Sequence, residues 1–189
     1  MRNTPIVPGH YYHFYNRGVN RQPIFFIEEN WGYFIRRLRA YCLPEFLDIL
    51  AYCLMPNHYH LLVRICGLDV GKRVMQPLTV SYAKSINKQQ NRSGHLFQGP
   101  FQARLVDNDG YLKWLSRYIH LNPVAAGLVT RPADWAYSSY REYVGLRQGT
   151  LPACAFILSQ FPSPQAYAAF VESPTSLETG LNADLLFDE

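Results

Sequence analysis

The stretch that decides the fold is Met55-Pro56-Asn57-His58-Tyr59-His60-Leu61-Leu62-Val63. An apolar run over residues 46–55 leads into it, and a second apolar stretch covers residues 58–64. Proline and asparagine favour tight turns, so the stretch predicts a hairpin of two strands. Successive side chains of a strand point to opposite faces, which places His58 and His60 on one face and Tyr59 on the other. The predicted hairpin therefore brings two imidazoles together on one side of a sheet.

The segments around the hairpin predict an α+β fold. Aromatic residues over 11–15 indicate a strand that closes at Asn16-Arg17-Gly18, and apolar residues at three- and four-residue intervals indicate helices over 28–42 and 70–91. A short strand over 104–106 and a helix to residue 121, capped by Asn108 or Asp109, follow. Pro77 should start or kink the second helix, and Pro123 should end the third. This order is typical of a ferredoxin-like split β-α-β sandwich, an antiparallel sheet with helices packed on it.

Composition favours one folded, soluble domain. With 189 residues, 48% of them hydrophobic and 17% charged, the chain can bury a core and is not a disordered polyelectrolyte. No apolar run approaches the roughly 20 residues that cross a bilayer, so we expect no membrane contact and a soluble, intracellular protein. Cysteines at positions 42, 53, 66 and 154 contain no C-x-x-C pair, which favours core thiols over disulfides or a zinc site.

Charge divides the chain at residue 150. All 18 Lys and Arg lie in residues 1–150 together with 9 acidic residues, whereas residues 151–189 hold 5 acidic residues and no basic one, giving sums of +9 and −5. A basic body suits a polyanion such as nucleic acid, although ordinary soluble proteins also carry such a surplus. We predict a domain over 1–150 and an acidic C-terminal tail over 151–189. The tail is either a solvated extension or a regulatory strip that covers the basic groove and restrains activity.

The paired histidines are candidate metal ligands. Neutral imidazole binds divalent metals well, and His58 and His60 supply two positions of a shell that needs at least one more ligand. The alternative is that two histidines share a partly exposed face by chance. We expect His10, His13 and His95 to be surface or hydrogen-bonded residues outside the site.

A second candidate pair lies on the predicted third helix. Tyr118 and Asn122 are four residues apart and therefore share one helical face. Tyrosine has a pKa near 10 and needs activation to act as a nucleophile, which a metal held by His58 and His60 would provide by polarising a phosphoryl group. The alternatives are that Tyr118 is a core aromatic and that Asn122 ends the helix. His120 faces nearly away from Tyr118 and is a weaker ligand candidate.

Cationic, amide and aromatic side chains alternate in the segments around this predicted site. Cations can follow a phosphate backbone while aromatic rings stack on unpaired bases, which suits single-stranded or hairpin nucleic acid. The alternative is a solvated basic helix beside a core loop. The candidate contacts are Arg17, Arg21, Lys84, Lys88, Arg92, Phe97, Gln98 and Arg104.

Four motifs in this order resemble a known family. The histidine motif at residues 55–63 is similar to that of HUH single-strand endonucleases. This motif and three further stretches together resemble the REP-associated tyrosine transposases, members of the single-tyrosine superfamily of the insertion-sequence type. The three stretches are residues 16–18 (Asn-Arg-Gly), 94–99 (Gly-His-Leu-Phe-Gln-Gly) and 118–129 (Tyr-Ile-His-Leu-Asn-Pro-Val-Ala-Ala-Gly-Leu-Val). The similarity extends from about residue 11 to residue 143.

The resemblance implies an enzyme that cuts and rejoins palindromic hairpin DNA through a 5′-phosphotyrosine. It implies Tyr118 as the nucleophile and His58, His60 and Asn122 as ligands of Mg²⁺ or Mn²⁺. Asn16 and Arg17 become candidates for reading single-stranded bases beside the hairpin. By the same resemblance the protein is expected to be a monomer or homodimer in the bacterial cytoplasm, associated with the nucleoid.

The chain departs from the family pattern at Asn122, where related enzymes often carry the longer Gln, at Pro77 and in the acidic tail. A non-catalytic nucleic-acid-binding protein derived from a transposase, and a hydrolytic metal nuclease without a covalent intermediate, remain alternatives.

Overall fold

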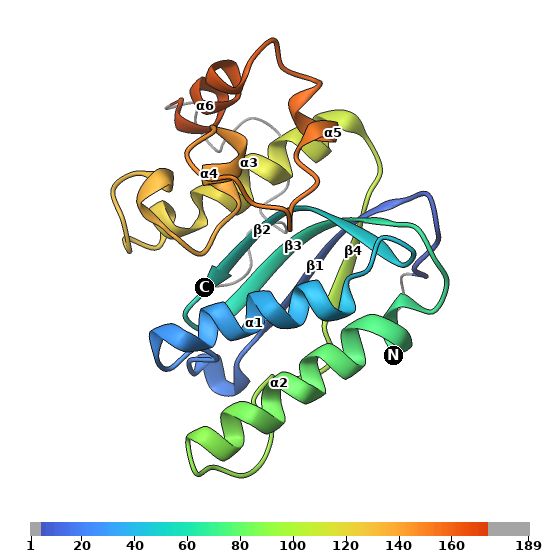
Figure 1. Cartoon of the computed structure of the whole chain (residues 1–189), viewed down its shortest axis with the longest axis vertical. Coiled ribbons are helices and arrows are strands. Elements are labelled where there is room, and N and C mark those ends of the chain that lie inside the picture. Colours follow the sequence, from blue (N-terminus) through green and yellow to red (C-terminus); the bar gives the residue numbers. More distant parts are fainter. Residues whose placement is uncertain (1–4, 174–189) are drawn as a thin grey trace.

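An antiparallel hairpin forms the centre of the fold. Strand β2 (Leu47–Met55) and strand β3 (His58–Ile65) are joined at Pro56-Asn57, as the sequence predicts. Strand β1 (Tyr11–Arg17) pairs with β3, and strand β4 (Gln102–Val106) pairs with β1, which gives the order β2-β3-β1-β4 with every pair antiparallel. The computed structural model describes residues 5–173, and it confirms the expected ferredoxin-like α+β architecture (Figure 1).

Two apolar layers cover the two faces of this sheet. Helices α1 (Glu28–Tyr41) and α2 (Gln76–Gln89) lie on one face, where Phe34 packs against both Tyr59 of β3 and Tyr82 of α2 (Figure 1). Helix α3 (Asp109–Ala125) covers the other face, where Ile119 shares a cluster of buried side chains with Leu62. The alternation of β3 therefore directs the tyrosine toward α1 and α2, and both histidines toward α3.

Helix α2 begins in a wider turn than the sequence pattern predicts. The segment Gly71–Met75 is π-helical, and Pro77 follows in the first turn of α2. Proline has no N–H to donate to the residue four positions earlier, so an irregular turn before it is readily accommodated. The expected helix over 70–91 is thus divided just before Pro77.

Helix α3 does not end at Pro123, in contrast to the sequence prediction. Asn108 caps its start, accepting a hydrogen bond from the Tyr111 N–H at 2.7 Å, and the helix continues through Pro123 to Ala125. Gly127, with φ of 68°, then closes it, because the N–H groups of Gly127 and Leu128 donate to the carbonyls of Val124 and Pro123. One extra turn is possible because only the single hydrogen bond from residue 123 is lost.

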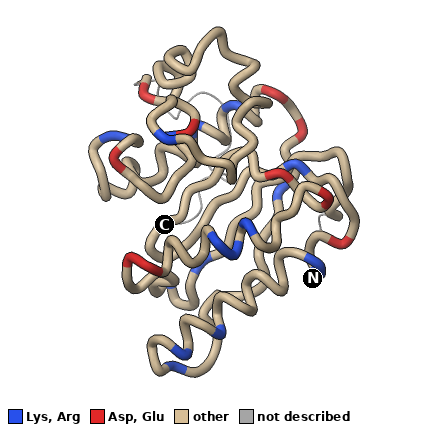
Figure 2. Tube along the Cα trace, viewed as in Figure 1, with Lys and Arg blue, Asp and Glu red and all other residues tan. Residues whose placement is uncertain are grey.

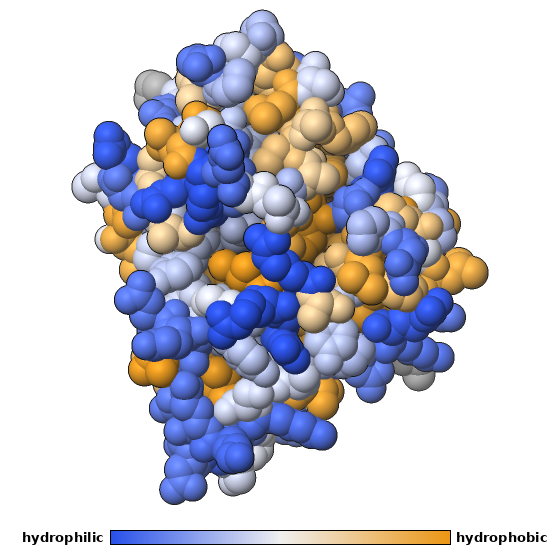
Figure 3. Space-filling view, in the orientation of Figure 1, coloured by the Kyte–Doolittle hydropathy of each residue, from blue (hydrophilic) through white to orange (hydrophobic). Residues whose placement is uncertain are grey.

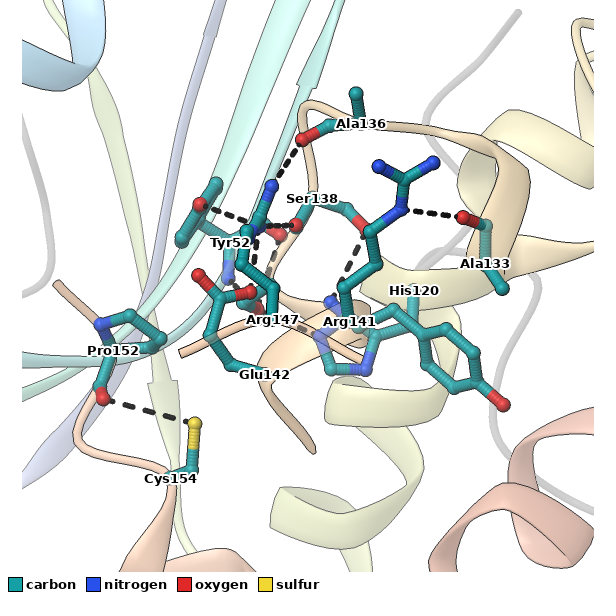
Figure 4. A network of polar contacts seen from close by, with 12 residues as sticks. Tyr52, His120, Ala133, Ala136, Ser138, Arg141, Glu142, Arg147, Pro152 and Cys154 are labelled. Atoms are coloured by element: carbon teal, nitrogen blue, oxygen red, sulfur yellow. Dashed lines mark hydrogen bonds and ion pairs between the residues drawn. The ribbon is translucent and has the colours of Figure 1, made fainter. Parts of the chain in front are cut away.

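The segment after α3 folds back along the sheet. It contains the 3₁₀ turn Pro132–Asp134 and helix α4 (Tyr140–Tyr143). Arg147 holds it together by donating to the carbonyl oxygens of Ala136 and Ser138 and to the carboxylate of Glu142 (Figure 4). Another 3₁₀ turn, Val19–Arg21, follows β1.

Residues 151–173 belong to the packed body, unlike the separate tail that charge composition predicts. Helices α5 (Ala155–Leu158) and α6 (Pro164–Glu172) contribute Ile157, Tyr167 and Val171, all 0% exposed, to the apolar cluster that includes α3 (Figure 1). Apolar burial, which a net charge does not reveal, joins them to the fold. Residues 174–189, with four of the five acidic residues of the expected tail, lie outside the described residues, and the regulatory role stays a prediction.

No helix within residues 5–173 is both long enough and apolar enough to cross a membrane.

Candidate active site

Strand β3 presents two imidazoles to the underside of α3. His60 is 2% exposed and His58, at the start of the strand, is partly buried. In the strand register His58 lies opposite Arg17 of β1, and His60 lies opposite Tyr15. The two rings are edge to face with centroids 4.8 Å apart. The predicted histidine pair is therefore held in the middle of the sheet, on the face that α3 covers.

The side-chain amide of Asn122 lies between these two rings. Its Oδ1 is 3.2 Å from Nε2 of His58, and its Nδ2 is 3.3 Å from Nε2 of His60. The extension of α3 beyond Leu121 places Asn122 inside the helix, with its side chain held against the sheet. Asparagine is thus long enough to reach both histidines directly.

The neighbouring turn decides which nitrogen of His58 carries its proton. Nδ2 of Asn57 donates to the carbonyl oxygen of Arg21 at 3.2 Å, so that Oδ1 of Asn57 faces Nδ1 of His58 at 2.6 Å. An amide oxygen only accepts, so Nδ1 of His58 is the protonated nitrogen and Nε2 keeps its lone pair. That lone pair points at the oxygen of Asn122, another acceptor.

These three atoms make a donor set that fits a divalent cation. The Asn122 amide can donate an N–H to only one of the two Nε2 atoms at a time, so its oxygen end always faces the other. The two Nε2 atoms and the amide oxygen could together offer their lone pairs to a cation such as Mg²⁺ or Mn²⁺. Within residues 5–173, no group of three or more His, Cys, Asp and Glu side chains could hold a metal ion, so the remaining ligands would be amide, water or phosphate oxygens.

Burial keeps both imidazoles neutral. It lowers the pKa of His58 to about 4, although the Asn122 oxygen acts in the opposite direction, because it would accept a hydrogen bond from the protonated ring. Burial also lowers the pKa of His60 well below its ordinary value, and the neighbouring His58 and His13 lower it further. A neutral imidazole is the form that binds metal, so protons do not compete for these lone pairs near neutral pH.

Tyr118 lies beside the histidines, one helical turn before Asn122. Its ring meets the ring of His60 edge to face with centroids 5.5 Å apart, and it is stacked on Trp114 at 5.5 Å with an interplanar angle of 10°. Trp114, Tyr118 and Asn122 are four residues apart and share one face of α3. The sequence-predicted nucleophile and ligands are thus together, contributed by β3 and α3.

Four of the predicted DNA contacts surround this cluster. Arg17 lies opposite His58 and donates through Nε to Oε1 of Gln98 at 2.5 Å. The carbonyl of Arg21 holds the turn that carries Asn57. On the other side, Arg104 of β4 lies opposite His13. The Arg17 and Arg104 side chains bring positive charge close to His58 and His13, and Gln98 adds an amide group beside Arg17.

Lys84, Lys88 and Arg92 do not join the site. Lys84 and Lys88 are exposed on α2, on the face of the sheet opposite α3, and Arg92 lies over the ring of Phe26 at 5.9 Å. Lys and Arg residues mark this end of α2 in Figure 2, and the surface there is largely hydrophilic (Figure 3). The second helix therefore carries a separate basic surface.

Two further predicted contacts are buried and held by interactions within the protein. Asn16 is 6% exposed, and its amide donates to the Gly99 carbonyl at 3.0 Å and accepts from the Arg17 N–H at 2.9 Å. Phe97 is 8% exposed and packs in the core against Tyr59 and Tyr82, so it is a core ring rather than a free stacking platform. These placements favour a structural role for both, and base reading by Asn16 stays a prediction.

His13 belongs to the site, contrary to the expectation that it lies outside. It is 2% exposed, and its Nε2 is 2.9 Å from Nδ1 of His60. The signal was available, because strand alternation puts His13 on the same face of β1 as Arg17, and a split β-α-β order pairs the first strand with the third. His120, by contrast, is fully buried away from the site, where it contacts Tyr167 and Ser139.

Comparisons with known proteins agree on the type of fold and family. A family model described as "Transposase IS200 like" matches residues 6–122, well over half of the chain. A Haemophilus influenzae protein named "Putative REP-associated tyrosine transposase" is 28% identical over 107 residues, which cover 51% of this chain and 61% of that protein. The match thus spans less than two thirds of that relative.

A solved structure shares the architecture. It is described as "Structure of the REP associates tyrosine transposase bound to a REP hairpin", and it matches with a TM-score of 0.59 over 80% of this chain and 96% of that one. At 16% sequence identity this likeness concerns the fold.

Proposed function

The chain belongs to the IS200-like transposase family, and from this we propose that it is a metal-dependent single-strand DNA endonuclease and transposase. It cuts and rejoins DNA at palindromic hairpin repeats through a 5′-phosphotyrosine. One observation carries the proposal: the lone pairs of His58 and His60 converge on Asn122 while the ring of Tyr118 lies against His60. A buried structural cluster would have no need of a phenol beside unprotonated imidazole nitrogens.

Tyr118 supplies the attacking oxygen in this proposal. The phenol oxygen forms a bond to phosphorus as the bond from phosphorus to the 3′ oxygen breaks. The phenol loses its proton and the departing 3′ oxygen gains one, which leaves a free 3′-hydroxyl and a 5′-phosphate esterified to the tyrosine. One phosphodiester replaces another, so a different 3′-hydroxyl can reverse the step without ATP.

The remaining residues would position the reacting groups and hold the ion that offsets the phosphate charge. His58, His60 and Asn122 would hold the Mg²⁺ or Mn²⁺ ion, which when bound polarises the phosphate and offsets its developing charge. Trp114 restrains Tyr118 by stacking on its ring, so the hydroxyl does not sample the rotamers of a free side chain. His58 and His60 remain neutral through burial and therefore keep their lone pairs available.

The DNA is proposed to be a hairpin with a single-stranded flank. The fold neighbour is described as bound to a REP hairpin, and the H. influenzae relative carries the same type of name. Arg17, Arg21, Gln98 and Arg104 lie nearest the candidate site and are the proposed contacts of the flank, with Arg17 suited to a guanine edge. The α2 cations would contact more distant phosphates, since they lie on the other face of the sheet.

A covalent-adduct assay tests this proposal. The full chain is incubated with Mg²⁺ or Mn²⁺ and hairpin DNA labelled 3′ of the cut, and the products are separated under denaturing conditions. We expect a labelled protein band that disappears in Tyr118→Phe and in EDTA. Tyr111→Phe is a matched control, because Tyr111 lies on the same helix and its buried hydroxyl has no hydrogen-bond partner among the described residues.

The other outcomes identify the alternatives. Hairpin binding that persists in EDTA without any cut would indicate a binding protein derived from a transposase. Metal-dependent cutting that Tyr118→Phe tolerates, with a free 5′-phosphate as product, would indicate a hydrolytic nuclease.

A further inference from the structure

A third histidine contacts the candidate site from the neighbouring strand. His13 lies on β1, and its Nε2 is 2.9 Å from Nδ1 of His60 on β3. The strand register places Leu62 opposite His13 and Tyr15 opposite His60, so the contact is diagonal across the ladder. Both rings are 2% exposed, and their centroids are 5.0 Å apart with an interplanar angle of 30°. Water therefore has little access to the hydrogen bond between them.

The direction of this hydrogen bond follows from the other side of the His60 ring. Nε2 of His60 faces the Nδ2 donor of Asn122 at 3.3 Å, so Nε2 is an acceptor and carries no proton. A neutral imidazole carries one proton, which must then be on Nδ1. His60 accordingly donates from Nδ1 to Nε2 of His13.

Each candidate ligand thus has its own partner on the ring nitrogen that faces away from Asn122. For His58 the partner is Oδ1 of Asn57 at 2.6 Å, and for His60 it is Nε2 of His13. A metal-bound histidine generally donates its other N–H to such a partner, which fixes the ring's orientation and the nitrogen that is free to bind. Nε2 of His13 is directed at Nδ1 of His60, so this nitrogen supports the His60 ring rather than facing the Asn122 amide.

We propose that His13 is a positioning residue that fixes His60 as the tautomer with an unprotonated Nε2, and thereby sets the affinity of the site for its divalent cation. The inference deepens the proposed function and rests on it where it concerns metal affinity. The proton assignment itself does not depend on any metal. His13 acts only through His60 and touches neither DNA nor the reacting phosphate.

Two variants separate this role from simple packing. His13→Gln places an amide oxygen near the position of Nε2, so it can still accept from His60, whereas His13→Leu fills the space without an acceptor. His10→Gln is the control, because the His10 side chain is exposed and its Nδ1 is hydrogen-bonded to the carbonyl of Pro8, outside the candidate site. Mn²⁺ binding to the metal-free full chain is measured from the electron paramagnetic resonance signal of free Mn²⁺.

We expect His13→Leu to weaken Mn²⁺ binding by about 10- to 100-fold, the usual loss when an outer partner of a ligand is removed. His13→Gln should stay within about threefold of the wild type. In the metal-free wild type, ¹⁵N NMR should show His60 protonated on Nδ1, with a coupling across the hydrogen bond to Nε2 of His13, and His13→Leu should give a mixture of His60 tautomers.

The NMR measurement needs no variant, so a poorly folded His13→Leu does not prevent the test. Protonation of His60 on Nε2 in the wild type would overturn the inference, and so would a His13→Leu variant that binds Mn²⁺ like the wild type. Failure of the wild type to bind Mn²⁺ would instead contradict the proposed function, together with the affinity part of this inference, while the tautomer would still report on the His13 hydrogen bond.

Discussion

Replacing Tyr167 with phenylalanine tests whether α6 is an integral part of the fold. The Tyr167 hydroxyl is 2.7 Å from Nδ1 of His120 and 3.2 Å from Oγ of Ser116, and all three residues are 0% exposed. Tyr167→Phe keeps the ring packed and leaves two buried polar groups with one partner fewer. Such a loss costs about 1–3 kcal/mol. With a midpoint of about 2 kcal/mol and about 2–4 °C per kcal/mol for a chain of this size, Tm should fall by about 4–8 °C.

Tyr111→Phe provides the matched comparison. The Tyr111 hydroxyl is also buried, but it has no hydrogen-bond partner among the described residues, so its removal should change the free energy of unfolding by less than about 0.5 kcal/mol. Urea unfolding followed by circular dichroism, with thermal melts on the same samples, measures both variants. The reasoning is refuted if Tyr167→Phe is as stable as the wild type, as a separable tail over residues 151–189 would require, or if the two variants lose equal stability.

Three further predictions concern the site and its surroundings. Asn122→Ala should weaken Mn²⁺ binding at least about tenfold, because it removes the group that faces both Nε2 atoms. Titration of the metal-free protein measures this, and unchanged affinity would exclude Asn122 as a ligand. Trp114→Ala should lower the rate of adduct formation and leave Mn²⁺ affinity unchanged, because Trp114 stacks on the ring of Tyr118. A change in Mn²⁺ affinity alone would contradict the role of Trp114 in restraining Tyr118. Burial lowers the pKa of His120 to about 3, so below the ordinary pKa of about 6.5 the unfolded chain binds more protons than the folded chain. The contribution of His120 to stability is therefore complete above that pH, and the free energy of unfolding should fall by about 1.4 kcal/mol at pH 5.5 from His120 alone. Urea unfolding at pH 7.5 and pH 5.5 checks this, and equal stabilities would be the contrary result.

The fold followed from local patterns in the sequence. Strand alternation and the Pro56-Asn57 turn predicted the hairpin, and the order of elements then determined the antiparallel sheet. Helix ends were less predictable. Pro123 signals an end, yet it lies within the last turn of α3, and the residue that closes the helix is Gly127. A proline costs little where the helix needs only one more turn, and this balance depends on the packing of the whole element.

The candidate site was predictable where its residues are close in the chain. His58 and His60 share a strand face, and Tyr118 and Asn122 share a helix face, so spacing alone identified both pairs. Their meeting came from the family resemblance. His13 was missed because its contact with His60 depends on the register between β1 and β3, a long-range pairing that no local pattern specifies.

Charge was a poor guide to position. The Lys84 and Lys88 side chains follow the same basic pattern as Arg17 and Arg104, but the sheet separates α2 from the imidazoles. Likewise, the absence of basic residues after residue 150 concealed three fully buried side chains in α5 and α6. Composition reports what a segment carries, whereas its place in the fold depends on which side chains are buried.

The central claim is that the Tyr118 hydroxyl becomes esterified to DNA beside the paired histidines. Mass spectrometry of the trapped adduct, after nuclease and trypsin digestion, tests this most directly. Cleavage after Arg117 gives a peptide that begins at Tyr118, and we predict that it carries the mass of a 5′-nucleotide on that first residue. A nucleotide on any other tyrosine, or efficient DNA cutting with no modified peptide, would contradict the account.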